Sequence, residues 1–186
     1  PRPYPVMEDT GFRRAVALGT RTRTGEPGPR YWQQHAEYRL RASLDSATRR
    51  LTGTGTVRYA NRSPDTLRTI AVHLRQNLFA PGAMRNELVP LTGGVTLSRV
   101  VADGAALQPA EDSSRTGVWT EGTIAWLRLP RPLAPGGTTT LEFGWSFIVP
   151  PDGAPRGGVD GETYFVSYWY PQLAVYDDVG GWQVGQ

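Results

Sequence analysis

The sequence predicts an all-β protein, an antiparallel sandwich of about eight or more strands with little helix. The 186 residues include 22 Gly and 16 Pro, so turns must be frequent. They also include 6 Trp and 8 Tyr, which favour strands and an aromatic core or binding face. Apolar residues recur at every second position in short runs bounded by turn residues, and this pattern is typical of half-buried strands.

Composition excludes several kinds of site. The chain contains no Cys, so disulfides, thiolate zinc sites and cysteine nucleophiles are excluded. The net charge is +3, and no long basic run carries interleaved aromatic residues, so we expect no nucleic-acid partner. No apolar run approaches the length of a membrane span, so we expect no transmembrane segment. A cleaved signal peptide leaves no trace, and a periplasmic or secreted location is favoured over a cytoplasmic one.

Residues 1–30 are expected to form an irregular N-terminal arm, and residues 31–186 a single β domain. The arm is rich in Pro, Gly, Arg and Thr, and residues 12–18 suit a short helix or an irregular packed segment. Its arginines allow two interpretations: a basic arm that docks on an acidic partner, or a solvated leader, which the composition favours. These arginines are Arg13, Arg14, Arg21, Arg23 and Arg30.

Strands are expected where alternating or β-branched and aromatic residues lie between turn signals. Over residues 38–44 and 138–149 apolar side chains alternate with other ones, so each segment has one packed face. Asp103-Gly104 and Glu121-Gly122 are hairpin turn signals between later strands. Loops are expected over 80–92, 130–137 and 150–161, where Pro and Gly are frequent. The expected strands are 38–44, 51–59, 67–74, 95–101, 118–120, 123–129, 138–149 and 164–169, with a short apolar run at 173–176.

Two separate stretches resemble one protein family. The first is the aromatic run Y-F-V-S-Y-W-Y-P-Q-L-A-V-Y-D-D-V-G-G-W at residues 164–182, in which Pro171 should end a strand or lie at an edge or bulge. The second begins at Tyr31 and includes N-R-S-P-D-T-L at residues 61–67 and H-L-R-Q-N at residues 73–77. In the same order, both resemble the N-terminal β domain of aminopeptidase N-like zinc metallopeptidases, the gluzincins, and most closely their bacterial members.

The resemblance implies a saddle-shaped β domain that performs no chemistry by itself. In this family the domain packs against a thermolysin-like catalytic domain and helps to hold the N-terminus of the peptide substrate. That catalytic domain belongs either to the same protein or to a companion chain. Its zinc, bound by H-E-x-x-H and a further Glu, polarises the peptide carbonyl and activates water. The present chain lacks both H-E-x-x-H and the family's G-x-M-E-N motif, so we expect no cofactor on this chain and zinc only on its partner.

The resemblance also bears on the end of the chain. Similar sequences continue with further strands after the G-W pair, so we expect the domain to be incomplete at its C-terminal end. An exposed sheet edge near the C-terminus follows from this expectation, unless another segment covers it.

Three residues are candidates for binding the amine of a substrate. In similar bacterial sequences the residue before W-Y-P is often Gln, and a Gln or Glu from this region helps to hold the substrate amine. Tyr168 occupies that position here and departs from the pattern. Glu162 lies upstream and offers a carboxylate, which suits an ammonium group through a charge-assisted hydrogen bond. Gln172 is the third candidate. Packing of Tyr168 and solvation of Glu162 are the simpler alternatives.

The histidines and the paired aspartates have plainer explanations than a catalytic site. His35 and His73 lie too far apart for helical i, i+4 spacing, so we expect strand-edge histidines in a hydrogen-bonded surface and no zinc site. Asp177 and Asp178 are adjacent and should point to opposite faces, so turn capping is expected instead of an acid/base pair.

Two short motifs also have simpler interpretations. Gly53-Thr-Gly55 lacks the third Gly and the following helix of a phosphate-binding loop, and it lies within a predicted strand. Asn61-Arg62-Ser63 matches a glycosylation acceptor, but Pro64 follows it and a turn accounts for these residues.

A stand-alone binding or scaffold module remains the alternative function. An aromatic β-sandwich can bind carbohydrate or another protein through an exposed face. Exposure of Trp126, Trp169 and Trp182 on one flat surface would favour this alternative, and burial of all three would count against it.

Overall fold

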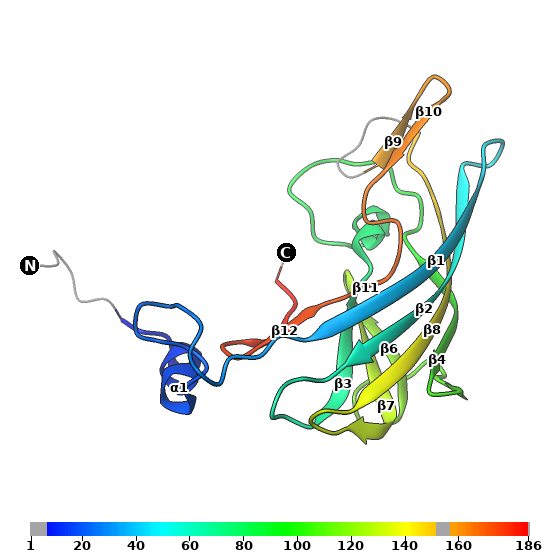
Figure 1. The fold of residues 1–186 in the computed structure, drawn as a ribbon. Helices are drawn as coiled ribbons and strands as arrows, with labels where there is room; N and C mark the ends of the chain where they lie inside the picture. Colours follow the sequence, from blue (N-terminus) through cyan, green and yellow to red (C-terminus); the bar gives the residue numbers. More distant parts are fainter. Residues whose placement is uncertain (1–6, 152–156, 186) are drawn as a thin grey trace, which may run out of the picture.

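The computed structural model describes residues 7–151 and 157–185 and shows two packed antiparallel sheets (Figure 1). One sheet has the strand order β1-β2-β8-β4-β5, and the other has the order β11-β3-β7-β6. The predicted all-β antiparallel sandwich is confirmed. Its elements are α1 (Thr10–Leu18), β1 (His35–Asp45), β2 (Arg50–Ala60), β3 (Leu67–His73), the 3-10 helix η1 (Arg75–Phe79), β4 (Thr96–Ala102), β5 (Ala105–Ala106), β6 (Gly117–Glu121), β7 (Ile124–Leu133), β8 (Thr138–Ile148), β9 (Gly157–Asp160), β10 (Thr163–Val166), β11 (Gln172–Leu173), β12 (Val175–Asp177) and β13 (Gly181–Gln183).

The five-stranded sheet is built on the predicted hairpin. β1 and β2 pair from His35–Ala60 to Asp45–Arg50, and β8 pairs with the other edge of β2. The side chains of β8 alternate as the sequence predicts, because one face packs on the second sheet and the other meets solvent. The packed face of this sheet carries Leu51, Val57, Tyr59, Leu141, Phe143, Trp145 and Phe147, all buried in the core.

β3 is buried on both faces and forms the centre of the second layer. Ile70 and Val72 face the main core, while Ala71 packs with Ile124 and Ala174 in a smaller cluster. Trp182 covers this smaller cluster from outside, and its indole N–H donates to the Thr69 carbonyl at 3.1 Å. The C-terminal aromatic run therefore closes the outer face of the sandwich.

Two glycines in β2 make room for the largest buried side chain. Trp145 is 1% exposed, and its indole ring lies over Gly53 and Gly55. A Cβ atom at Gly53 would overlap this ring. The Gly-Thr-Gly motif is therefore a packing feature of a strand, as expected from the sequence.

Asn61 builds the corner between β2 and β3 and is fully buried. Its amide donates to the carbonyls of Asp65, Leu133 and Ala134, and its side-chain oxygen accepts from Ser63. The predicted turn is confirmed, and the buried amide nitrogen is fully used in hydrogen bonds within the fold.

β7 is longer than the sequence predicts. It runs to Leu133 through two prolines, where a loop over residues 130–137 is expected. Its register with β3 shifts in this region, from the Thr69–Arg128 pair to the Leu67–Leu133 pair. Prolines are tolerated at such irregularities because no regular ladder bond requires their N–H.

The predicted loop over residues 150–161 and strand over residues 164–169 also need correction. β9 lies inside that loop and pairs with β10, while residues 152–156 of the loop lie outside the described residues. β10 ends at Val166, because Tyr168 adopts a positive φ of 52° that cannot continue a strand. This turn, and not Pro171, ends the strand.

The N-terminal arm, residues 7–30 of the described chain, contains the short helix α1. Asp9 caps its start, since its carboxylate accepts from the N–H groups of Gly11 and Phe12, and Gly19 ends it with a φ of 75°. In Figure 1 the arm stands beside the sandwich and meets it near β12. Within the described residues, no helix is long and apolar enough to cross a membrane.

Candidate functional site

Tyr168 lies on a turn that two buried side chains hold from either side. The Gln76 side chain donates to the Ser167 carbonyl at 2.6 Å, and the Trp145 indole N–H donates to the Trp169 carbonyl at 2.8 Å. Tyr168 itself adopts a left-handed backbone conformation, which costs a bulky residue about 1–2 kcal/mol. Strain of this kind persists where the surroundings fix it and is frequent at functional sites.

Arg75 is the neighbour that defines the electrostatics of Tyr168. Its guanidinium lies 5.0 Å from the centre of the Tyr168 ring, a cation–π distance, and Tyr168 as a residue is 42% exposed. A substrate ammonium group at this position would meet a positive charge. Amine binding here therefore needs a carboxylate from a further residue.

The structure separates the three predicted site residues. Gln172 is half-buried in β11, where it pairs with His73 of β3, so Gln172 and Tyr168 both adjoin the segment that joins β3 to η1. Glu162 is exposed in the β9–β10 turn, at the tip of a hairpin that points away from η1 (Figure 1). Their role in substrate binding stays a prediction.

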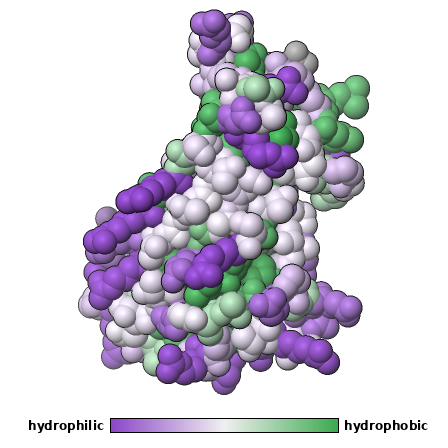
Figure 2. Space-filling view, turned by 90° about the vertical axis from the view of Figure 1, so that its right-hand side faces the viewer, coloured by the Kyte–Doolittle hydropathy of each residue, from purple (hydrophilic) through white to green (hydrophobic). Residues whose placement is uncertain are grey.

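An apolar surface lies at the same end of the molecule. Met84, Leu88 and Leu91 are 95%, 104% and 58% exposed on the loop that follows η1, and Phe165 of β10 is 44% exposed. Because η1 leads into this loop and also holds the turn of Tyr168, these side chains share one end of the sandwich. Figure 2 shows hydrophobic side chains projecting at the height of this loop. We call Met84, Leu88, Leu91, Phe165 and Tyr168 the loop-end surface.

The loop of this surface is held in a defined shape. The N–H groups of Thr92 and Gly93 donate to the Phe79 carbonyl at 3.0 and 3.2 Å, which closes the loop at its base. Arg85 donates to the carbonyls of Leu78 and Ala80 at 3.1 and 3.2 Å. The base of the loop is therefore fixed, and Met84, Leu88 and Leu91 project from the segment that it closes.

The described residues contain no group of three or more His, Asp or Glu side chains that could hold a metal ion. His35 is exposed and lies 3.3 Å from the Glu37 carboxylate. The expectation of a strand-edge surface residue is wrong for His73, which is buried in β3 between β11 and β7. Burial and then the charge of Arg75 lower the pKa of His73, so the ring is neutral near pH 7.

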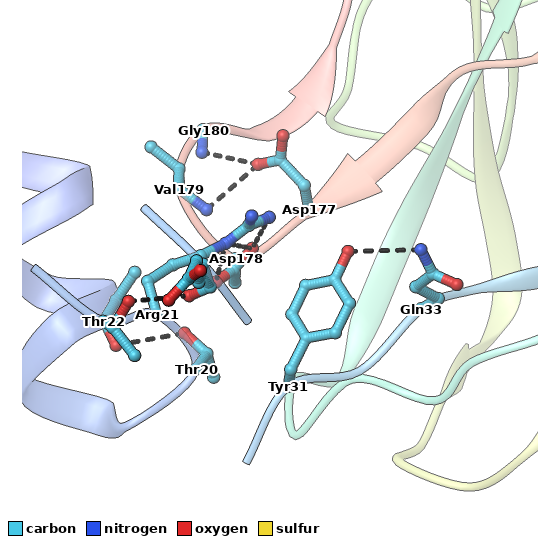
Figure 3. A network of polar contacts seen from close by, with 11 residues as sticks. Thr20, Arg21, Thr22, Tyr31, Gln33, Asp177, Asp178, Val179 and Gly180 are labelled. Atoms are coloured by element: carbon cyan, nitrogen blue, oxygen red, sulfur yellow. Dashed lines mark hydrogen bonds and ion pairs between the residues drawn. The ribbon is translucent and has the colours of Figure 1, made fainter. Parts of the chain in front are cut away.

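The two aspartates have different roles (Figure 3). Asp177 caps its turn, as expected, and accepts from the N–H groups of Val179 and Gly180 at 3.0 and 2.7 Å. Asp178 instead binds Arg21 of the arm, with three N–O distances of 2.9 to 3.1 Å. The interpretation of Arg21 as part of a solvated leader is therefore wrong, because its guanidinium is fixed on the β domain.

The three tryptophans of the alternative function do not form one exposed platform. Each is half-buried against a different partner: Trp126 stacks on Trp119, Trp169 packs on Trp145 and Trp182 packs on Tyr176. Trp126 and Trp182 both pack against the small cluster of Ala71, Ile124 and Ala174, whereas Trp169 packs against the main core.

Sequence reasoning missed Gln76 and Arg75 as the residues that position Tyr168. The H-L-R-Q-N run contains both, but the pairing of η1 with the turn of Tyr168 spans 91 residues. No local sequence pattern indicates this contact.

The fold is similar to solved structures of M1 zinc metallopeptidases. No family model and no curated protein matches the chain. An M1 zinc metallopeptidase mutant from Deinococcus radiodurans is 19% identical with a TM-score of 0.46, covering 77% of this chain and 28% of that one. The unmutated enzyme from the same organism is 19% identical with a TM-score of 0.45, covering 76% of this chain and 28% of that one. A two-domain M1 zinc metallopeptidase mutant bound to L-tryptophan is 17% identical with a TM-score of 0.42, covering 72% of this chain and 25% of that one. The chain therefore spans about a quarter of the length of these proteins.

Proposed function

We propose that this chain is the non-catalytic β domain of a zinc aminopeptidase-like metallopeptidase. It packs on a catalytic partner through the loop-end surface and borders the site that holds the N-terminus of the peptide substrate. The sequence resemblance supports the family, and the exposed apolar side chains of the loop-end surface carry the proposal of a partner.

The loop-end surface suits a protein partner better than solvent. Single exposed apolar residues are common, but a group of large ones on one loop marks an interaction site. Met84 and Leu88 are almost fully exposed and have no part in the core of this chain. Covering such side chains contributes about 1.5–3 kcal/mol each.

The turn of Tyr168 supplies the link to substrate binding. Tyr168 belongs to the loop-end surface, so a partner docked there would enclose its turn. Tyr168 and Gln172 then border the space between the two polypeptides, and Arg75 supplies a positive charge beside them. On this proposal the ammonium group is bound by a carboxylate, from Glu162 or from the partner, and zinc belongs to the partner alone.

The native mass and zinc content of the protein from its source test the proposal. We expect the chain to be part of a species larger than its own 20.4 kDa, with zinc in stoichiometric amount and aminopeptidase activity. A metal-free species of 20.4 kDa would overturn the proposal and leave the stand-alone binding or scaffold module.

Variants of the loop-end surface test the contact itself. Replacing Met84, Leu88 and Leu91 together by Ser should abolish co-purification with the partner and leave thermal unfolding of the chain unchanged. Leu44→Ser and Val175→Ser remove side chains that are 40% and 66% exposed elsewhere, so they serve as matched controls and should not affect co-purification.

A further inference from the structure

A cleft lies between the N-terminal arm and the β domain, apart from the loop-end surface. It has a volume of about 760 Å³ and is formed by the arm on one side and by the 62–65 turn and the β12–β13 turn on the other. The ion pair of Arg21 and Asp178, which we call the clasp, joins these two sides. We call this space the arm cleft; its most prominent lining side chains are Arg14, Arg30, Tyr31, Trp32, Arg62 and Tyr176.

One wall of the arm cleft is aromatic and fixed in place. The rings of Trp32 and Tyr176 stack at 5.9 Å with an angle of 23° between their planes. Tyr176 also packs on Trp182 at 5.0 Å, and its hydroxyl donates to Asp65 at 2.9 Å. Burial, followed by that hydrogen bond, raises the pKa of Tyr176 to about 12, so the hydroxyl stays a donor at neutral pH. A preformed wall of this kind suits a flat apolar group.

The carboxylates around the arm cleft are already engaged. Asp178 is bound by Arg21, Asp65 accepts from Tyr176, and Asp177 accepts from two backbone N–H groups of its own turn. None of them is left to neutralise a further arginine of the lining.

Three arginines of the lining have no such partner. Within residues 7–151 and 157–185, the side chains of Arg14, Arg30 and Arg62 make no hydrogen bond or ion pair, and all three are exposed. A guanidinium offers a rigid fork of N–H donors that matches a carboxylate in a bidentate manner. The arm cleft thus combines an aromatic wall with unpaired positive charge.

We propose that the arm cleft binds a small aromatic carboxylate. The ring lies on the wall of Trp32 and Tyr176, and the carboxylate is bound by arginines of the rim, among which Arg30 and Arg62 belong to opposite sides. The site needs no catalytic partner, so it stands independently of the function proposed above.

Calorimetric titration of the chain with matched naphthalene probes tests the proposal. We expect 2-naphthoate to bind saturably at one site, and 2-naphthylmethylamine, which has the same ring and the opposite charge, to bind at least tenfold more weakly. The double variant Arg30→Gln with Arg62→Gln should weaken 2-naphthoate binding by at least tenfold. Arg58→Gln with Arg131→Gln removes two exposed arginines outside the lining and serves as the control.

The aromatic wall is tested separately from the charge. Trp32→Phe keeps a ring and should retain binding, whereas Trp32→Ala should weaken it at least tenfold. Unchanged thermal unfolding of the arginine variants shows that they remain folded. The proposal is overturned by equal binding of the acid and the amine, by no effect of Arg30 and Arg62, or by no saturable binding. Binding of 2-naphthyl phosphate more than tenfold tighter than 2-naphthoate would overturn the assignment of a carboxylate.

Discussion

Arg21 binds Asp178 in a two-pronged ion pair that joins positions 157 residues apart. The side chain of Asp178 is only 4% exposed, so the arginine neutralises a carboxylate that the fold has largely removed from water. Among the described residues this clasp is the ion pair that joins the N-terminal arm to the β domain, and it spans the two sides of the arm cleft.

Breaking the clasp should release the arm. We expect Arg21→Gln to lower the free energy of arm opening by about 2 kcal/mol, since hydrogen bonds to charged groups contribute about 1.5–3 kcal/mol. Amide hydrogen exchange in α1 should then accelerate about 30-fold, a factor that follows from this energy. Arg23→Gln is the control, because its ion pair with Glu8 is more exposed and less effective. Equal exchange in both variants would contradict the role of the clasp.

The same contact gives arm opening a dependence on pH. Burial raises the pKa of Asp178, but hydrogen bonds from Arg21 and Thr20 and the charge of Arg21 outweigh this effect and lower it. A lowered folded-state pKa stabilises the closed arm above the unfolded value of about 3.9, and this contribution is lost as the pH falls through the folded value. Hydrogen exchange measured from pH 6 down to pH 3 should show this loss, and Asp178→Asn should abolish it.

Asn61→Ala should destabilise the protein by about 3 kcal/mol. The change leaves buried carbonyls and N–H groups of the β2–β3 corner without partners, and each such group costs about 1–3 kcal/mol. Urea unfolding gives the value, with Asn86→Ala in an exposed loop as the control. A loss below about 1 kcal/mol would show that water replaces the lost amide.

Gly53→Ala should destabilise the protein by about 1–3 kcal/mol through overpacking. The added methyl group overlaps the indole ring of Trp145, which is 1% exposed and packs on the Trp169 ring at 6.1 Å. Urea unfolding of Gly53→Ala and of Thr54→Ala, an exposed neighbour in the same strand, compares the two positions. Similar unfolding midpoints would mean that the ring can shift.

Tyr59 and Tyr176 should respond differently to loss of the hydroxyl. The Tyr59 hydroxyl is buried without a hydrogen-bond partner in the described part of the chain, and burial raises its pKa well above its usual range. Tyr59→Phe should therefore leave the free energy of unfolding unchanged or raise it by up to about 1 kcal/mol. Tyr176→Phe loses the hydrogen bond to Asp65 and should lower the free energy of unfolding by about 1 kcal/mol. The opposite order in urea unfolding would contradict these contacts.

Tyr168→Gly should separate strain from substrate binding. Glycine adopts the left-handed conformation freely, which offsets the loss of the contact with Arg75, so unfolding should change by less than about 1 kcal/mol. In the complex with the catalytic partner we expect KM for an aminoacyl anilide to rise about fivefold, or about 1 kcal/mol of binding. Unchanged KM would remove Tyr168 from the substrate site and leave its role to packing.

The sandwich could be predicted from the sequence because its strands alternate cleanly. Leu141, Phe143, Trp145 and Phe147 share one face in the sequence pattern and in the structure. The end of β10 could not be predicted in this way, because the apolar run continues beyond Val166 while the backbone turns at Tyr168. That turn is imposed by hydrogen bonds from distant side chains, which no local pattern contains.

The candidate site could be predicted only in part, for a similar reason. The family resemblance pointed to Tyr168, but its neighbour Arg75 arrives through the fold of η1 against the turn. The clasp of Arg21 and Asp178 was not predicted, because an arm rich in Pro, Gly, Arg and Thr is expected to be solvated. Ion pairs between remote segments carry no periodic signal in the sequence.

The long reach of the C-terminal contacts has a consequence for how the protein folds. Trp182 binds the Thr69 carbonyl, 113 residues away, and the Leu173 N–H binds the Tyr38 hydroxyl, 135 residues away. Contacts of such separation form late and slowly, because long loops must close before they stabilise anything. The hairpin of β1 and β2 can form during synthesis, but the small cluster of Ala71 and Ile124 on the outer face of β3 is covered only after Trp182 has left the ribosome. Until then this face is exposed, so we expect a chaperone to bind the growing chain and to leave it once the aromatic run is in place.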